Sequence, residues 1–363
     1  MPRRDIIIVG GGVIGCSLAL ELARAAIPVQ IVERGEPGRE ASWAAAGMLA
    51  PSGEFVLQDQ QTRLARASAA LYPEWLARLR ELSSIDVGHR TEGTLQLAFS
   101  EAEARELDAL PGERISGAEA RRLEPALSEN VAAAVYLRDD HQVDNRRLLE
   151  ALVEAAGRAG VVFRTGVEVR ELLIESGRAR GVRTAEGTVL EAGAVVNAAG
   201  SWAGTWGEAA RRLAPTRPVR GQMLAVRGEA SFLRHIVRSP RGYIVPRDDG
   251  RLLLGSTMED AGYDKSVTPE ALRRLLAGAR EIVPAVAALP YESAWAGLRP
   301  DTPDHLPILG ATDIENFFIA TGHFRNGILL APITAKLMTE VILGRPPSIS
   351  LEPFSPLRFR PPR

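Results

Sequence analysis

The first regular pattern along the chain is a strand, a glycine-rich turn, a helix and a second strand. Residues 5–9 are an apolar, β-branched run without polar alternation, which is typical of a parallel strand covered on both faces. Over residues 14–26 the apolar positions follow a helical period, and residues 28–32 return to a strand pattern. The pattern therefore predicts one βαβ unit at the start of the chain.

Apolar periods farther along the chain predict further helices and one further buried strand. Amphipathic spacing predicts helices over residues 64–82 and 147–158, and a final long helix over residues 328–343. Residues 161–163 form a short apolar run that is typical of a buried strand. These elements extend the α/β pattern of the first unit.

Alternating apolar and polar positions predict antiparallel structure in two later stretches. Over residues 181–197, short alternating runs broken by Gly187 and Gly193 predict a hairpin that leads into an apolar strand at residues 194–198. Residues 218–255 contain several β-rich pieces separated by glycines, which predicts an antiparallel sheet in a second domain. The sequence shows no repeat and no low-complexity tract, so we expect the two domains to share several crossings.

Composition and charge narrow the partners that this chain can have. Hydrophobic content of 45%, charged content of 25% and a formal net charge of -1 are ordinary for a globular protein and give no long-range attraction for nucleic acid. Cys16 is the only cysteine and cannot form an internal disulfide, which favours a reducing cytoplasm. The glycines between residues 10 and 15 break the apolar run that imitates a secretory signal, and no other stretch approaches the ~20 apolar residues that cross a bilayer. We therefore expect a soluble, cytoplasmic protein without a membrane partner.

A glycine fingerprint follows the first strand. Gly10, Gly12 and Gly15 have the spacing G-x-G-x-x-G between a strand and a helix, where missing side chains let the backbone approach a pyrophosphate and the helix N-terminus stabilises its charge. Glu33 ends the second strand, where a carboxylate can accept hydrogen bonds from ribose hydroxyls. The combination predicts dinucleotide binding, and it leaves NAD and FAD both open.

Five motifs then point to a family. They are GGGVIG from residue 10, ASWAAAGMLAP from residue 41, VVNAAGSWAG from residue 195, WAGLRPDTPDHLPILG from residue 295 and GHFRNGILLAP from residue 322. In this order and along essentially the whole chain, the sequence resembles the D-amino-acid-oxidase-like FAD-dependent oxidoreductases, most closely the glycine oxidases of thiamine biosynthesis. The resemblance implies FAD as the cofactor.

The resemblance implies an α/β fold, α+β overall, with two interleaved domains, and the length of 363 residues also favours two domains over one. A Rossmann-like FAD-binding domain is expected beside a smaller substrate-binding domain built on an antiparallel sheet. The expected FAD-binding segments are residues 1–85, 145–215 and 299–363. The expected substrate-binding segments are residues 86–144 and 216–298.

The family's FAD contacts carry over onto positions of this chain that match its motifs. Cys16 lies inside the glycine turn and no histidine occurs between residues 35 and 47, so non-covalent FAD is expected. The expected cofactor-binding residues are Gly10, Gly12, Val13, Ile14, Gly15, Glu33, Arg34, Ala41, Ser42, Ala46, Gly47, Met48, Val169, His323, Phe324, Arg325, Asn326, Gly327, Ile328 and Leu329.

The resemblance also implies a substrate site. Arg299 matches an arginine that pairs with the substrate carboxylate through its planar fork, and Tyr243 matches a tyrosine that donates a second hydrogen bond to it. Arg325 matches another substrate-side residue, although an arginine there can equally brace a loop. Met48 and Met258 match apolar residues that line a small pocket, and methionine is also a common gap-filler in any core.

One position departs from the family pattern. Arg241, which we also expect at the substrate site, stands two residues before Tyr243, where the glycine oxidases carry histidine, so the polarity of the pocket and the substrate preference are left open there. His235, His305 and His323 show no metal-ligand spacing, so we expect no metal and no catalytic side chain beyond the flavin.

The activity that the resemblance implies is oxidative deamination of glycine and other small amines such as sarcosine or D-alanine. Dioxygen would accept the electrons, and the products would be an imine or glyoxylate, ammonia and hydrogen peroxide. The imine would serve thiazole formation through hand-over to a thiazole synthase, and the family implies a homotetramer. A sarcosine or D-amino-acid oxidase and an FAD-dependent amino-acid dehydrogenase are the alternatives, followed by a nicotinamide-dependent dehydrogenase and a non-catalytic flavin-binding subunit.

Overall fold

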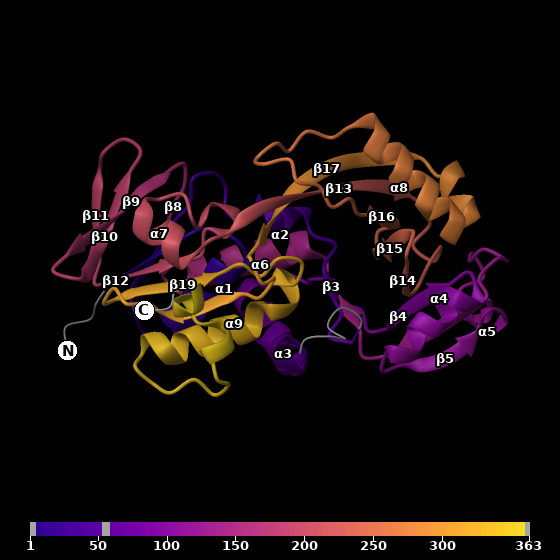
Figure 1. Cartoon of the computed structure of the whole chain (residues 1–363), viewed down its shortest axis with the longest axis horizontal. Coiled ribbons are helices and arrows are strands. Elements are labelled where there is room, and N and C mark those ends of the chain that lie inside the picture. Colours follow the sequence, from indigo (N-terminus) through magenta and orange to yellow (C-terminus); the bar gives the residue numbers. More distant parts are fainter. Residues whose placement is uncertain (1–4, 53–58, 360–363) are drawn as a thin grey trace.

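Two large sheets organise the computed structural model, which describes residues 5–52 and 59–359. One sheet has six strands and the other has eight. Figure 1 shows the elements of the six-stranded sheet on the left and those of the eight-stranded sheet on the right. Two long strands, β13 (Arg217–Arg227) and β17 (Tyr291–Asp301), run from the middle of the molecule into the right-hand half.

The six-stranded sheet contains the predicted βαβ unit. Its order is β18-β19-β12-β1-β2-β8, and all neighbours are parallel except the edge pair β18 and β19. Its strands are β1 (Ile6–Val9), β2 (Val29–Val32), β8 (Val162–Arg164), β12 (Ala194–Asn197), β18 (Ile308–Ala311) and β19 (Phe317–Thr321). The parallel strand and following helix predicted near the N-terminus are confirmed.

Strand β1 is apolar at every position because both of its faces are covered. Ile6 and Ile8 belong to a helical core on one face, whereas Ile7 and Val9 belong to a second core on the other face. Side chains alternate between the faces of a strand, so a continuous apolar run is required where helices or sheets pack on both sides.

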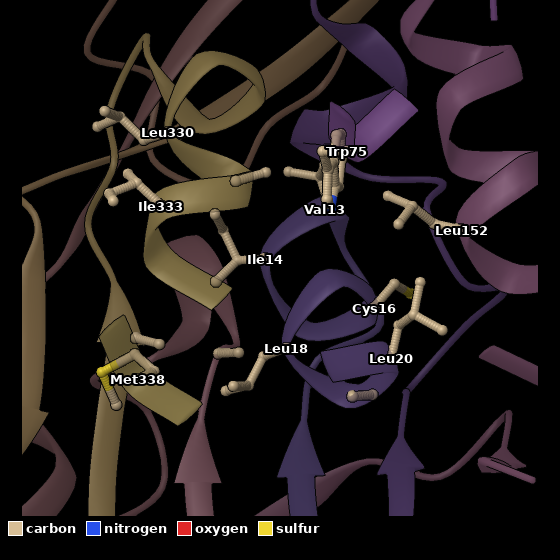
Figure 2. Packing of buried hydrophobic residues seen from close by; sticks show 14 of the residues in the cluster. Val13, Ile14, Cys16, Leu18, Leu20, Trp75, Leu152, Leu330, Ile333 and Met338 are labelled. Carbon is tan, nitrogen blue, oxygen red and sulfur yellow. The ribbon is translucent and has the colours of Figure 1, made fainter. Parts of the chain in front are cut away.

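Four helices form the first of these cores. They are α1 (Val13–Arg24), α3 (Asp59–Ser83), α6 (Asn145–Arg158) and α9 (Gly327–Ile342). Figure 2 shows Ile14 and Leu18 of α1 facing Ile333 and Met338 of α9. The predictions of helices over residues 64–82, 147–158 and 328–343 are confirmed to within a few residues.

A small sheet and a short helix cover the other face. The sheet consists of β9 (Val169–Glu175), β10 (Arg178–Thr184) and β11 (Val189–Glu191), all antiparallel, and the helix is α7 (Glu208–Leu213). Their apolar residues, among them Leu172, Val182 and Leu213, pack with Ile7 and Val9 of β1. The hairpin predicted within residues 181–197 is confirmed, with β9 as an additional strand before it.

The eight-stranded sheet has the order β17-β13-β16-β15-β14-β4-β6-β5, and only β14 and β4 are parallel neighbours. Its further strands are β4 (Thr94–Ala98), β5 (Glu113–Ser116), β6 (Ala133–Leu137), β14 (Ile236–Ser239), β15 (Gly242–Pro246) and β16 (Arg251–Gly255). Helix α8 (Pro269–Ile282) packs on one face, where Ile282 joins Val237 and Ile244 in a common core. The antiparallel sheet predicted over residues 218–255 is confirmed.

The remaining elements are short. They are α2 (Ala41–Ala44), β3 (Met48–Leu49), α4 (Glu101–Glu106), α5 (Gly117–Leu123) and β7 (His141–Gln142), with 3-10 helices at Leu107–Ala109, Gly200–Trp202, Pro284–Ala288, Glu352–Phe354 and Pro356–Phe359. Strand β3 pairs with β7, which fixes the backbone at Met48 and Leu49. In the described part of the chain, every helix is too short or too polar to cross a bilayer.

Candidate cofactor and substrate site

One continuous cavity touches both large sheets. Its lining begins at the β1–α1 turn and the end of β2, continues along the α2–β3 segment, and ends on β13, β14, β15 and β17. The segment between β19 and α9 closes one side. The cavity is therefore long enough to bring a nucleotide-binding turn and polar groups of the second sheet into one site.

The glycine turn has the geometry that a phosphate-binding turn requires. Gly10 has a φ of +109°, and a Cβ at this position would overlap the carbonyl oxygen of Ala198. A Cβ at Gly15 would overlap the carbonyl oxygen of Gly10, so Gly15 permits the close packing of helix on turn. Gly12 is the N-cap of α1, whose first turn has no acidic residue, and both Gly12 and Val13 line the cavity. A helix start of this kind favours an anion, and the Val13 amide donates to the Ser42 hydroxyl oxygen at 3.0 Å.

Glu33 ties this turn to the end of β2. It is only 9% exposed, and its carboxylate accepts hydrogen bonds from the amides of Gly11 at 2.8 Å and Gly35 at 2.9 Å. The same residue lines the cavity. Because a carboxylate has about four lone-pair sites, it can hold both amides and still accept from a hydroxyl group.

A layered stack of side chains forms the wall beside Glu33. The guanidinium of Arg34 lies 3.4 Å from the ring centre of Trp202, and Tyr263 stacks on the same indole at 5.3 Å. Glu40 pairs with both Arg34 at 2.5 Å and Lys265 at 3.1 Å. Arg34, Glu40 and Trp202 all line the cavity, so planar and charged groups surround this end of it.

Arg247 holds the α2–β3 segment in place from the second sheet. It is 4% exposed, and its guanidinium donates to the Ala46 carbonyl oxygen at 2.7 Å and to the Gln142 side chain at 2.8 Å. Burial lowers the pKa of Arg247 to about 10, which leaves it charged at neutral pH. Gly47 follows with a φ of +71° and no space for a Cβ, because the Val143 carbonyl oxygen lies there. The backbone beside Met48 is therefore rigidly placed.

Arg299 is held along the second sheet by two neighbours. Its guanidinium donates to the Ser256 hydroxyl oxygen at 2.7 Å and to the Thr257 carbonyl oxygen at 3.1 Å. A Cβ at Gly221 would overlap this guanidinium, so the glycine on β13 provides the space that the arginine occupies. Arg299, Ser256 and Gly221 all line the cavity. A fork fixed in this way is suited to bind a carboxylate.

Tyr243 lies on β15 beside this arginine. Its ring covers Gly255, with which it is paired across the strands, and its hydroxyl donates to the Met223 sulfur at 3.3 Å. Tyr243 and Met223 line the cavity. A sulfur is a weak acceptor, so a carboxylate oxygen would be a stronger partner for this hydroxyl.

The segment before α9 brings the start of a long helix to the cavity. Asn326 is the N-cap and Gly327 the first residue of α9, and both line the cavity. His323 is fully buried, its Nε2 lies 3.0 Å from the Thr334 hydroxyl, and burial lowers its pKa to about 3. His323 is therefore neutral and is a poor proton acceptor.

The structure brings most of the predicted site residues together. Of the expected cofactor-binding residues, all line the cavity except Gly15, which lies beneath the turn, and Leu329, which is buried in the helical core. Arg299, Tyr243, Arg325 and Met48 of the expected substrate site also line it.

Two predicted substrate residues lie elsewhere. Met258 is 64% exposed and is absent from the lining. Arg241 lies in the β14–β15 turn, where its guanidinium forms ion pairs with Glu103 at 3.0 Å and Glu281 at 2.7 Å. The expectation that these two side chains line the pocket is not met by this arrangement.

Sequence reasoning missed several residues of the site. Among them, Trp202, Ser256 and Arg238 line the cavity, and Arg247 supports its wall. Trp202 lies within the motif VVNAAGSWAG, and its place in that motif could have marked it as a site residue. The sequence contains no signal for Arg238, because only the pairing of β14 with β15 shows which face of the sheet its side chain occupies.

The residues present fit a dinucleotide such as FAD. A glycine turn at a helix N-terminus, a carboxylate at the end of β2 and a second helix N-terminus line one cavity. A Cβ at Gly10 or Gly47 would overlap the backbone of a neighbouring segment, so the close packing of these two parts of the lining requires glycine. Among the described residues, no group of three or more histidine, cysteine, aspartate or glutamate side chains is placed to hold a metal ion.

Comparison with known proteins gives the same family by sequence and by fold. The model of the family DAO, FAD dependent oxidoreductase, matches residues 5–341. The chain is 36% identical over 361 residues to the glycine oxidase of Pseudomonas putida, covering 97% of this chain and 98% of that one. It superposes on the crystal structure of glycine oxidase from Geobacillus kaustophilus with a TM-score of 0.93 at 36% identity, covering 97% and 98% of the two chains.

A second group of relatives is longer. The bifunctional protein ThiO/ThiG of Trichormus variabilis is 36% identical over 367 residues, which cover 98% of this chain and 55% of that protein. The chain spans about half the length of these bifunctional relatives.

Proposed function

The chain belongs to the DAO family of FAD-dependent oxidoreductases, and on that basis we propose that it oxidises glycine and similarly small amines with dioxygen. The observation that carries the proposal is the single cavity, which joins the α1 N-terminus and Glu33 to Arg299 and Tyr243. The relatives named glycine oxidase, which match nearly end to end, support glycine as the substrate.

FAD, when bound, accepts two electrons from the substrate and passes them to dioxygen. The residues of the chain bind and orient both partners. Glu33 would accept from ribose hydroxyls, and the α1 N-terminus would stabilise the pyrophosphate. Arg34, Ala41, Ser42, Ala46, Gly47, Met48 and Val169, with residues 323–328, would complete the non-covalent contacts.

Arg299 and Tyr243 would hold the substrate. The guanidinium binds the carboxylate through two parallel hydrogen bonds, and the tyrosine hydroxyl turns from the Met223 sulfur to a carboxylate oxygen. Because Ser256 and Thr257 fix Arg299, the α-carbon is oriented before any bond is broken. Arg325, at the end of the same cavity, would assist on the substrate side.

The chain supplies no strong base to this reaction among the groups described above. His323 is neutral and bonded to Thr334, and the cavity end near Arg299 is lined by arginine, tyrosine and serine. The amine would therefore enter in its neutral form after losing its proton to solvent. The balanced reaction is glycine with dioxygen and water giving glyoxylate, ammonia and hydrogen peroxide.

The imine formed on the way to glyoxylate would supply thiazole formation. The proposal is supported by relatives in which the matched region and a further segment form one bifunctional protein. We place the enzyme in the cytoplasm as a homo-oligomer, with a tetramer expected from the family resemblance. We also propose that residues 1–85, 145–215 and 299–363 form the FAD-binding domain and that residues 86–144 and 216–298 form the substrate-binding domain.

A panel of amino acids with a hydrogen peroxide readout tests the proposal. Purified holoprotein is expected to produce one peroxide per glycine consumed, to accept sarcosine and D-alanine, and to act slowly on bulky or L-amino acids. Reduction of an artificial electron acceptor without peroxide would show a dehydrogenase. Absence of flavin reduction by every amino acid under anaerobic conditions would refute amine oxidation altogether.

A further inference from the structure

The segment between β16 and α8, residues 256–268, holds Arg299 in place. Its Ser256 hydroxyl and Thr257 carbonyl oxygens accept from the guanidinium at 2.7 and 3.1 Å. Beyond Thr257, most of residues 258–266 are exposed. An exposed stretch of backbone has little packing of its own, so its position depends on the polar contacts that tie it to the sheet.

Arg220 on β13 makes several of these contacts. It is 9% exposed, and its guanidinium donates to the carboxylates of Glu259 and Asp264, each at 2.6 Å, and to the Ser266 hydroxyl oxygen at 3.1 Å. Its backbone also exchanges two hydrogen bonds with Glu259, at 2.9 and 3.0 Å. Arg220 does not line the cavity, so it can influence a ligand there only through other residues.

Gln222 strengthens the same attachment. Its fully buried side chain donates to the Glu259 carboxylate at 3.0 Å, and its amide donates to the Thr257 hydroxyl oxygen at 2.9 Å. Residues two apart on a strand share a face, so Arg220 and Gln222 hold the segment from the face of β13 opposite to Gly221, which lines the cavity. These contacts therefore position the segment without occupying the cavity.

The later part of the segment contacts the nucleotide side of the cavity. Tyr263 stacks on Trp202 with a ring-centre distance of 5.3 Å, and Lys265 pairs with Glu40 at 3.1 Å. Trp202 and Glu40 both line the cavity. The guanidinium on β13 therefore holds a segment that contacts the cavity wall at two separate places.

We propose that Arg220 is a positioning residue for the substrate, because it holds residues 256–266 on β13 and thereby fixes the two oxygens that orient Arg299. The inference rests on the proposed role of Arg299 as the partner of the substrate carboxylate. Without Arg220, the Arg299 guanidinium keeps its charge but must be ordered when the carboxylate binds, and that ordering lowers the affinity. The carboxylate pair is the same before and during the reaction, so the loss should appear mainly in KM.

Cleavage by a lysine-specific protease measures the order of the segment without a cofactor or a substrate. The chain contains two lysines, Lys265 in the segment and Lys336 in α9, so cleavage at Lys265 gives a fragment of residues 1–265. This cleavage should be at least about threefold faster in Arg220→Met, because proteolysis follows the population of locally opened chain. Cleavage at Lys336 is the internal reference and should not change. Equal cleavage at Lys265 in both proteins would overturn the inference.

Binding and kinetics measure the effect on the substrate in holoprotein. Acetate, followed by the flavin absorbance, should bind about tenfold more weakly to Arg220→Met than to the unchanged protein. The ratio of kcat/KM for glycine to that for ethylamine should fall by a similar factor. Ethylamine has no carboxylate, so a general loss of structure would slow both amines alike and leave the ratio unchanged. Arg220→Lys keeps the charge but loses the fork, so its ratio should lie between those of the two proteins.

Two further variants make the test specific to this contact. Asp264 is exposed, so Asp264→Asn should fold normally and give a smaller fall in the same ratio. Arg227→Met is the matched control, because Arg227 lies at the other end of β13 and pairs with Glu292 at 2.7 Å; it should leave the ratio unchanged. Flavin content checks that each variant is folded, and Asp264→Asn carries the test if Arg220→Met does not fold.

Failure of this inference and failure of the proposed function give different results. If the folded variants of Arg220 and Asp264 keep the acetate affinity and the glycine-to-ethylamine ratio of the unchanged protein, the inference is overturned while glycine oxidation stands. Acetate binding that weakens in Arg220→Met, in a protein that oxidises no amino acid, would support the inference and overturn the proposed function.

Discussion

Arg299 is held in its binding geometry by the protein itself. Ser256 and Thr257 each accept from its guanidinium, and Gly221 leaves it the necessary space. A residue fixed in this way loses little freedom when a carboxylate arrives, so its contribution to substrate orientation should be large. Among the site residues, Arg299 is therefore the one whose substitution should reduce the proposed activity most.

Substitution of Arg299 should separate substrate binding from cofactor binding. Arg299→Ala is expected to lower kcat/KM for glycine by roughly 10² to 10³ or more, which corresponds to about 3 to 5 kcal/mol for a desolvated pair. Arg299→Lys keeps the charge and loses the fork, so it should also oxidise glycine poorly. Both variants should retain FAD, measured by the flavin spectrum. Slow oxidation of ethylamine, which has no carboxylate, is the internal control, and near-normal glycine kinetics in FAD-loaded Arg299→Ala would move the carboxylate partner to Arg325 or Arg238.

Glu33 stabilises the glycine turn and is proposed to bind FAD, and substitutions can distinguish these two roles. Its carboxylate holds the amides of Gly11 and Gly35, and we propose that it also accepts from the ribose of FAD. Glu33→Ala should therefore weaken FAD binding by about 1 to 3 kcal/mol per lost charged hydrogen bond and should also lower the melting temperature of the apoprotein. Glu33→Gln keeps one acceptor oxygen, so its FAD affinity and its melting temperature should lie between those of the unchanged protein and Glu33→Ala. If Glu33→Ala binds FAD normally in a titration, the carboxylate serves the turn alone.

At the scale of elements, the sequence revealed those parts whose pattern follows from local packing. The apolar runs of β1 and α9, the glycine turn and the amphipathic α6 are covered by neighbours in ways that leave a clear pattern. Strands β5 and β6, at one end of the eight-stranded sheet, and helix α8 were not predicted. The two strands are short, so their apolar pattern is brief, whereas α8 carries a clear amphipathic pattern, with Ala271, Ala279 and Ile282 buried, that was not recognised.

The site residues divide in the same way. Those proposed to contact the cofactor through the backbone of a turn were recognisable from glycine spacing, as at Gly10 and Gly12. Met258 was carried over from a family pattern and Arg241 was a departure from it, and the turns that hold them direct Met258 to solvent and Arg241 to Glu103 and Glu281. Side-chain direction in a turn depends on tertiary pairing that a single sequence does not contain.

The α2–β3 segment is a further place where an element depends on one residue. Gly47→Ala would require a left-handed backbone from alanine and would drive its Cβ into the Val143 carbonyl, so β3 and β7 would have to separate. We expect loss of FAD binding and a fall in the melting temperature. Gly157→Ala is the matched control, because this glycine lies in α6 with no atom near the added Cβ; it should raise stability by about 0.5 to 1 kcal/mol. A Gly47→Ala protein that binds FAD with normal affinity would contradict the proposed role of this segment.

The whole molecule builds its site from both sheets. The cavity is lined by the first sheet through β1 and β2, and by the second sheet through β13, β14, β15 and β17. Arg247, after the end of β15, links the second sheet to the α2–β3 segment through its bond to the Ala46 carbonyl oxygen. A ligand that contacts both sheets should therefore stabilise the molecule as a unit.

Removal and re-addition of FAD test whether the two sheets unfold together. The proposed cofactor contacts are spread over several segments. Cys16 is unsuited to a covalent link because its thiol is buried and donates to the Gly11 carbonyl oxygen at 3.3 Å. Burial and nearby Glu33 also raise the pKa of this thiol to about 12. Acid or heat should release FAD into the supernatant, and colour that stays with the precipitate would show a covalent flavin. Added back at 100 times its dissociation constant, FAD should stabilise the folded protein by about 2.7 kcal/mol. If FAD stabilises both sheets, a single melting transition should shift to higher temperature. Two transitions, of which only one shifts with FAD, would show that the cofactor binds to a single domain.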